Sequence, residues 1–105
     1  MVVVHMVMVK VKADTAEDVI ESVFAAVGGL KDAIEGSGIL EYTWGKYASP
    51  EGLGRGHTHG FCMKFTTAEA RDAYLPHPEH QKVADKVKAI TEGGIDGILA
   101  FDYTA

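Results

Sequence analysis

The sequence predicts an α+β fold of ferredoxin-like type, with its elements in the order β-α-β-β-α-β. Runs of β-branched and aromatic residues alternate in that order with apolar residues at helical spacing. The 105 residues are enough for one domain, 1–105. The first run, VVVHMVMVKVK at residues 2–12, is apolar on both faces, and the helices of so short a chain cover only one. We therefore expect a homodimer in which the sheets of two chains meet.

The first strand is followed by a helix. One face of that strand carries Val3, His5, Val7, Val9 and Val11. Asp14-Thr-Ala-Glu17 has the form of an N-cap residue with an acidic residue three positions later. Apolar residues then recur at helical spacing, at Ile20, Val23, Phe24, Val27, Leu30 and Ile34. Gly28-Gly29 lowers helix propensity by about 1 kcal/mol per glycine, which indicates close packing against the sheet.

Two strands and a loop form the middle of the chain. Residues 39–46, ILEYTWGK, predict the second strand and residues 57–66, HTHGFCMKFT, the third. The third strand places His57, His59, Phe61, Met63 and Phe65 on one face. The segment between them has alternating glycines but no Gly-Lys-Ser/Thr, which favours a hairpin loop over a phosphate cradle.

A proline kink divides the last helical region. Thr66-Thr-Ala-Glu69 predicts a helix start, and this helix continues to about Leu75. Pro76 and Pro78 interrupt it, because proline lacks an N–H and disfavours the α region in the preceding residue. A second helix resumes near His80, and residues 95–104 predict the last strand.

Composition excludes several classes of function. The formal net charge is −5 and no basic stripe appears, so we expect no nucleic-acid partner. No apolar run approaches the roughly 20 residues of a membrane span, and no basic amphipathic helix appears. Cys62 is the only cysteine, which excludes an intramolecular disulfide and fits a cytoplasmic protein. The apolar start lacks a basic n-region, so we interpret it as a strand and not as a signal peptide.

The five histidines are the side chains best suited to proton transfer near neutral pH. His5 lies inside an apolar strand and is either a satisfied core residue or a functional one. His57 and His59 share a strand face at a spacing that can chelate a metal, but no third ligand lies nearby in the sequence. We therefore predict no metal and no other cofactor.

The segment YLPHPEHQKV, residues 74–83, concentrates the candidate chemistry. His80 stands at a helix start, where free N–H groups and the helix dipole disfavour a protonated imidazole and favour a neutral general base. Tyr74, on the other side of the kink, can orient His80 or donate to a developing oxyanion. The alternative is that His77 and His80 only cap backbone groups in a proline turn.

These segments together resemble the stress-responsive α/β-barrel family, the Dabb domains. The resemblance is carried by VVVHMVMVKVK, GHTHGFCMKF, AYLPHPEHQKV and the closing FDYT, and so runs from end to end. It implies a dimeric ferredoxin-like fold, a dimeric α/β barrel. It also implies a pocket, with its clearest signature in the segment around His77 and His80.

Within the family, the chain is most similar to a plant polyketide cyclase that performs an aldol condensation without a cofactor. This resemblance implies a Tyr74–His80 acid-base pair and a small apolar or aromatic carbonyl substrate. It also implies substrate-binding roles for His5, His59 and His77, and for Phe24 and Val27, which lie where the cyclase has a pocket tyrosine. Because the first and third strands run antiparallel in this fold, their spacing alone does not make His5 and His59 neighbours.

Other functions fit the same family. One is a non-catalytic, stress-responsive dimer that binds a small apolar ligand. A cofactor-free monooxygenase of the related dimeric-barrel type is a third possibility, to which the motifs give less support.

Overall fold

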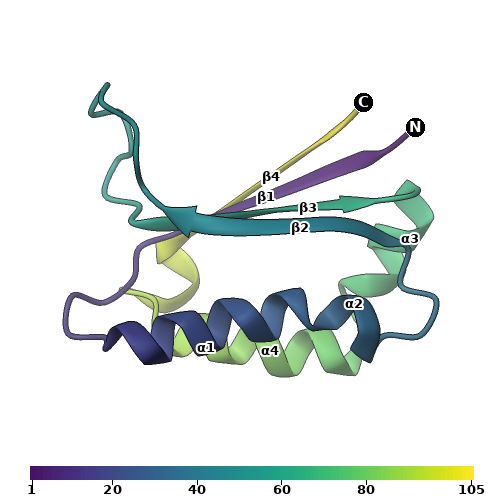
Figure 1. Cartoon of the computed structure of the whole chain (residues 1–105), viewed down its shortest axis with the longest axis horizontal. Helices are drawn as coiled ribbons and strands as arrows, with labels where there is room; N and C mark the ends of the chain where they lie inside the picture. The colour runs from purple at the N-terminus through teal and green to yellow at the C-terminus, as the bar shows by residue number, and fades with distance from the viewer.

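A four-stranded antiparallel sheet carries the two long helices on one face (Figure 1). This computed structural model describes all 105 residues. Its elements are β1 (Val3–Val9), α1 (Glu17–Gly28), α2 (Leu30–Ala33), β2 (Ile39–Lys46), β3 (His59–Phe65), α3 (Ala68–Tyr74), α4 (Pro78–Ala89), the 3-10 helix η1 (Gly94–Gly97) and β4 (Ile98–Thr104). The order confirms the predicted ferredoxin-like arrangement.

The sheet has the strand order β2-β3-β1-β4, so the apolar first strand lies inside it. β1 pairs with β3 and β4, both antiparallel. The two ends of the chain meet beside each other, because the Val2 N–H donates to the Ala105 carbonyl and the Ala105 N–H to the Val2 carbonyl. β1 is therefore held on both edges along its whole length.

The core lies between the sheet and the helices. The predicted inward face of the first strand is buried at every position: Val3, His5, Val7, Val9 and Val11. The predicted apolar stripe of the first helical region is also buried throughout: Ile20, Val23, Phe24, Val27, Leu30 and Ile34. Both periodicities, two for the strand and 3.6 for the helix, thus identified the core correctly.

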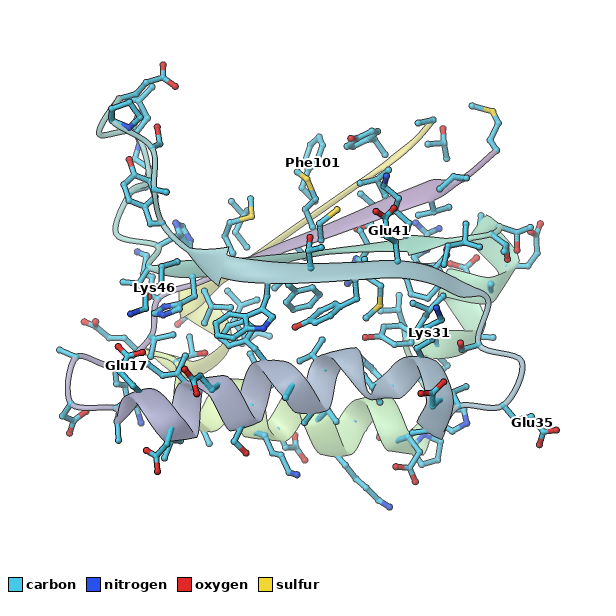
Figure 2. The ribbon with its side chains drawn as sticks, viewed as in Figure 1. Glu17, Lys31, Glu35, Glu41, Lys46 and Phe101 are labelled. Atoms are coloured by element: carbon cyan, nitrogen blue, oxygen red, sulfur yellow. The ribbon has the colours of Figure 1, made fainter.

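The opposite face of the sheet has no cover from its own chain. Leu99, Phe101 and Tyr103 alternate along β4 on this face and are 48%, 57% and 47% exposed. Figure 2 shows Phe101 on the side of the sheet away from the helices. In the pairing register Phe101 stands next to Met6, and Met6 next to Cys62. We call the set Met6, Met8, Cys62, Leu99, Phe101 and Tyr103 the outer face.

The helix starts differ from the predicted ones. The N-cap of α1 is Ala16, with no side-chain capping bond, and not Asp14. The second capping signal lies one residue later than predicted, because the Thr67 hydroxyl, not that of Thr66, accepts from the Ala70 N–H. Both regions contain consecutive residues suited to capping, and pattern alone does not fix the first helical residue.

Other boundaries also shift. The first helical region is divided at the glycine pair: α1 ends at Gly28, and α2 begins at Leu30. β3 begins at His59, so His57 belongs to the preceding loop. Residues 94–97 form η1, so the last strand begins at Ile98 rather than at residue 95. No helix has both the length and the apolar character needed to cross a membrane.

Candidate functional site

The proline segment forms a rigid corner between α3 and α4. α3 ends at Tyr74, and Pro78 occupies the first turn of α4, where its missing N–H costs no hydrogen bond. His77 is the N-cap of α4, and its Nδ1 accepts from the Glu79 N–H at 3.1 Å. His77 therefore caps α4, and it does not line the cavity described below.

His80 and Tyr74 face each other across this corner. Their ring centroids are 4.4 Å apart and the rings are tilted by 44°. Nδ1 of His80 lies 2.8 Å from the Leu75 carbonyl oxygen. Because a carbonyl only accepts, Nδ1 carries the proton and donates it. The other nitrogen of neutral His80, Nε2, is then a proton acceptor. His80 thus combines a backbone bond with a free basic nitrogen.

The surroundings of His80 favour its neutral form. Burial lowers the pKa of His80 below its usual 6.5, and the positive charges of His5, when protonated, and Lys88 lower it further. The bond to the Leu75 carbonyl acts in the opposite direction. The direction agrees with the sequence-based expectation, but burial, rather than the helix dipole, is the leading cause. Burial also raises the pKa of Tyr74, which keeps its phenol protonated as a donor.

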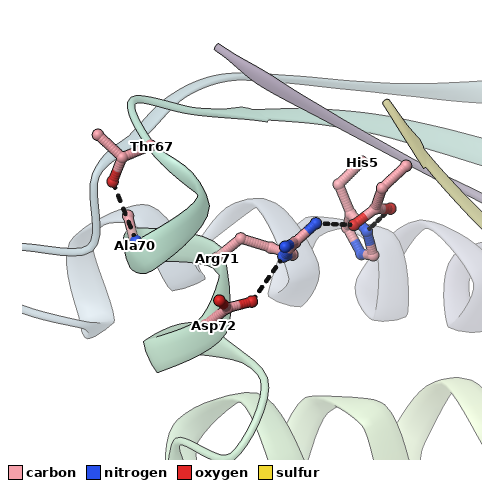
Figure 3. A network of polar contacts seen from close by, with 6 residues as sticks. His5, Thr67, Ala70, Arg71 and Asp72 are labelled. Atoms are coloured by element: carbon pink, nitrogen blue, oxygen red, sulfur yellow. Dashed lines mark hydrogen bonds and ion pairs between the residues drawn. The ribbon is translucent and has the colours of Figure 1, made fainter. Parts of the chain in front are cut away.

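His5 enters the same site from β1. Its ring stands edge-on to Tyr74, with centroids 6.3 Å apart. Its Nδ1 lies 2.6 Å from Oδ1 of Asp102 on β4, its partner in the pairing register. Oδ2 of Asp102 accepts from Arg71 Nη1 at 3.0 Å, and Arg71 Nε donates to Asp72 at 2.9 Å (Figure 3). His5 is thus a buried histidine with a charged partner.

These three side chains line one mostly apolar cavity of about 320 Å³, between the sheet and helices α1 and α4. The volume is in the range of small-ligand pockets. Polar groups enter it from His5, Tyr74, His80 and Lys88, and the other lining residues are Val7, Val27, Leu30, Phe61, Leu75, Val83, Ala84, Val87, Ile95, Ile98 and Ala100. A few polar groups in an apolar wall can orient a small ligand and exclude water from it.

His59 lies elsewhere. It pairs with Val9, whereas His5 pairs with Met63, so the two histidines are four residues apart, about 13 Å along the strands. The His59 ring stacks on Phe24 at 5.8 Å, and Phe24 stacks on Trp44 at 4.8 Å. Neither His59 nor Phe24 lines the cavity, whereas Val27 does. The structure therefore separates His59 and Phe24 from the predicted pocket residues that line the cavity, and His77 belongs to neither set.

His59 and Trp44 border a second, more open groove of about 340 Å³ that His57 also lines. Burial lowers the pKa of His59, and its Nε2 is buried without a hydrogen-bond partner. Nδ1 of His57 bonds to the Gly54 carbonyl oxygen at 2.8 Å, within the loop. No three His, Cys, Asp or Glu side chains gather in a way that could hold a metal ion.

Sequence reasoning missed Asp102 and Arg71. The signal for Asp102 was the alternation of β4, which places this carboxylate on the inward face, between the outward Phe101 and Tyr103. An inward carboxylate requires a partner, and its register position opposite His5 supplies one. Arg71 carries no such signal, because its approach to Asp102 depends on how α3 packs beside the sheet.

The fold and cavity define a ferredoxin-like α+β protein with a mostly apolar cavity, into which the imidazoles of His5 and His80 project. The chain belongs to the stress responsive A/B barrel domain family, whose model matches residues 3–105.

Three known proteins are similar over almost the whole chain. The stress-response A/B barrel domain-containing protein HS1 of Arabidopsis thaliana is 32% identical, over 94% of this chain and 85% of that protein. Olivetolic acid cyclase of Cannabis sativa is 28% identical, over 99% of this chain and 97% of the cyclase. A dimeric ferredoxin-like protein of unknown function from Jannaschia sp. superposes with a TM-score of 0.87 at 30% identity, with 100% of both chains covered.

Proposed function

We propose that this protein is a cofactor-independent enzyme that removes a proton next to a carbonyl group of a small apolar or aromatic compound. The observation that carries the proposal is the convergence of His80, Tyr74 and His5 on one apolar cavity. The lowered pKa of His80 supports it, because a neutral imidazole is the competent base. The similarity to olivetolic acid cyclase favours an aldol cyclisation of a polyketide as the concrete reaction.

The reaction needs only groups that the cavity holds. Nε2 of His80 takes the proton from the carbon, and the electron pair of the C–H bond forms an enolate. The Tyr74 hydroxyl donates a hydrogen bond to the enolate oxygen. The enolate carbon then attacks a second carbonyl of the same molecule, which forms the C–C bond and an alkoxide. The alkoxide takes the proton back from His80, so base and acid are the same residue.

The active form that we propose is a homodimer joined through the outer face. The exposed side chains of Leu99, Phe101 and Tyr103 form an apolar surface that a second sheet would cover. The described dimeric state of the Jannaschia protein supports this assembly. Since the cavity lies on the opposite side of the sheet, each subunit would hold a complete set of His5, Tyr74 and His80.

Turnover of a linear poly-β-ketone thioester, followed by mass spectrometry of the products, tests the proposal. His80→Gln should lower the rate by about 10²–10⁴-fold, the usual contribution of a general base. Tyr74→Phe keeps the ring and should lower it by about 10²–10³-fold, the contribution of one oxyanion donor. His57→Gln, in the loop outside the cavity, is the matched control and should retain the rate. If His80→Gln and Tyr74→Phe turned over the thioester as fast as the His57→Gln control, the acid-base role would be refuted.

A second candidate is a non-catalytic, stress-responsive dimer that binds a small apolar ligand. The 32% identity with HS1 and the capping bond of His77 favour it. Here an aromatic ligand would raise the Tm of the wild-type protein, and no thioester would be consumed. Thermal shift and turnover measured on the same samples therefore separate the two functions.

A further inference from the structure

Arg71 and Asp102 form a charged clamp behind His5. Neither residue lines the cavity, whereas His5 does. The clamp joins three elements, because His5 belongs to β1, Asp102 to β4 and Arg71 to α3. Its side chains are largely withdrawn from water, with 8%, 22% and 23% exposure for His5, Asp102 and Arg71. The clamp is therefore partly buried at Arg71 and Asp102 and fully buried only at His5, which distinguishes it from a fully exposed surface ion pair.

Each carboxylate oxygen of Asp102 has one partner. Oδ1 meets Nδ1 of His5 at 2.6 Å and Oδ2 meets Nη1 of Arg71 at 3.0 Å. Nε of the same guanidinium bonds to Asp72 at 2.9 Å, so the Arg71 side chain is held at two points. A guanidinium is always charged and has a planar donor fork, which fixes the direction of the carboxylate that it holds. Asp102 is thereby aimed at His5.

We propose that Arg71, acting through Asp102, is a positioning residue that holds neutral His5 in the Nδ1–H tautomer. A carboxylate only accepts, so Nδ1 of His5 must donate to it, and in a neutral ring this leaves Nε2 as an acceptor. The Leu75 carbonyl imposes the same tautomer on His80. The cavity then contains two imidazoles that each keep a basic Nε2.

The consequence for the ligand rests on the proposed function. One Nε2, that of His80, takes the proton from carbon. The other, that of His5, accepts a hydrogen bond from an O–H group of the ligand. The substrate class that fits both is a carbonyl compound with an enol or phenol hydroxyl, rather than one whose oxygens are all acceptors.

The tautomer can be measured without any substrate, from the ¹⁵N shifts of the His5 ring in two-bond ¹H–¹⁵N correlation spectra of the full-length protein at alkaline pH, where histidine rings are neutral. In the wild type the Nδ1–H tautomer should exceed the Nε2–H tautomer by at least about tenfold, because hydrogen bonds to charged groups are the stronger ones. Arg71→Gln should lower this ratio of tautomer populations by about threefold or more, because the guanidinium fork no longer holds Asp102 in place. Lys82→Gln removes one positive charge from an exposed pair on α4 and should leave it unchanged.

Asp102→Asn gives the sharper result. The N–H groups of Arg71 donate to the oxygen of the new amide side chain, so its NH₂ group faces Nδ1 of His5. Nδ1 must then accept, which forces His5 into the Nε2–H tautomer. In the double variant Arg71→Gln/Asp102→Asn no guanidinium orients the amide, and the two tautomers of His5 should approach equal populations. A reversal that depends on Arg71 is an effect that general loosening of the structure does not produce.

Two results would overturn the proposal: an Nε2–H tautomer of His5 in the wild type, or a tautomer that Arg71→Gln leaves unchanged in both backgrounds. Arg71→Lys keeps the charge without the fork and should be intermediate; it also serves if the glutamine variant fails to fold. Because no turnover is measured, a protein without cyclase activity can still satisfy this test, and an active one can still fail it.

Discussion

The rings of Tyr74 and His80 lie 4.4 Å apart although no helix connects them. Tyr74 is the last residue of α3 and His80 lies in the first turn of α4. Between them, Pro78 begins the second helix and the Leu75 carbonyl holds Nδ1 of His80. The corner therefore brings together two side chains that one continuous helix would direct differently, and it leaves Nε2 of His80 unprotonated.

The pH dependence of stability should report the burial of His80. Its folded-state pKa is below the unfolded value of 6.5, so the unfolded state binds the proton first as pH falls. The stability contributed by neutral His80 is complete above 6.5 and is lost as pH falls from 6.5 through the lowered pKa. Denaturation of the wild type and of His80→Gln at intervals from about pH 8 to about pH 5 measures this. We expect their free energies of unfolding to converge toward acid pH.

An NMR titration of the His80 ring protons gives the same pKa directly and should place it below 6.5. A midpoint at or above 6.5 would mean that the imidazole is solvated, and the general-base role would lose its electrostatic support.

Elements with a strong period were predictable from the sequence, and contacts between distant elements were not. The alternation in β1 and the helical spacing around Phe24 determined which residues are buried, because burial on one face follows directly from the backbone period. Tyr74 and His80 were predictable as a pair because they flank one short kink. The separation of His59 from His5 required the strand register, which no local pattern contains. The Arg71–Asp102 pair required tertiary packing, and its site role stays a prediction like those of the histidines.

His77 should matter for stability and not for proton transfer. Its Nδ1 caps α4 by accepting from the Glu79 N–H. His77→Ala should lower the free energy of unfolding by about 0.5–2 kcal/mol, whereas His77→Asn supplies another good cap and should cost less. Urea denaturation of both variants measures the difference. A large loss of turnover in His77→Asn with normal stability would instead give His77 a place in the chemistry.

The two adjacent glycines of the first helical region should respond in opposite directions to alanine. A Cβ on Gly28 would lie 2.8 Å from two ring carbons of Tyr42, whose hydroxyl is fixed to the Phe24 carbonyl at 2.7 Å. A Cβ on Gly29 would meet only the Ala25 and Ala26 carbonyl oxygens, no closer than 3.4 Å.

Gly29→Ala should therefore be neutral or stabilise the protein by up to about 1 kcal/mol, the helix-propensity difference. Gly28→Ala should destabilise it by about 1–3 kcal/mol, the usual cost of overpacking, despite the same gain in propensity. Thermal unfolding of the two variants decides the matter. Equal stabilisation by both would show that the Tyr42 ring moves aside freely.

The outer face should control the oligomeric state. Phe101 lies at the centre of the outer face, is 57% exposed and pairs with Met6 in the strand register. A glutamate there would have to lose its hydration on association, which costs several kcal/mol for an unpaired charge. Phe101→Glu should therefore yield monomers at concentrations where the wild type is dimeric, as measured by sedimentation velocity.

Val19→Glu is the control, since Val19 is a similarly exposed apolar residue, 42% exposed, on helix α1. A wild type that sediments as a monomer, or a Phe101→Glu variant that stays dimeric, would place the interface elsewhere or remove it. Because the cavity lies on the other side of the sheet, a folded Phe101→Glu monomer should keep the His5 tautomer of the wild type.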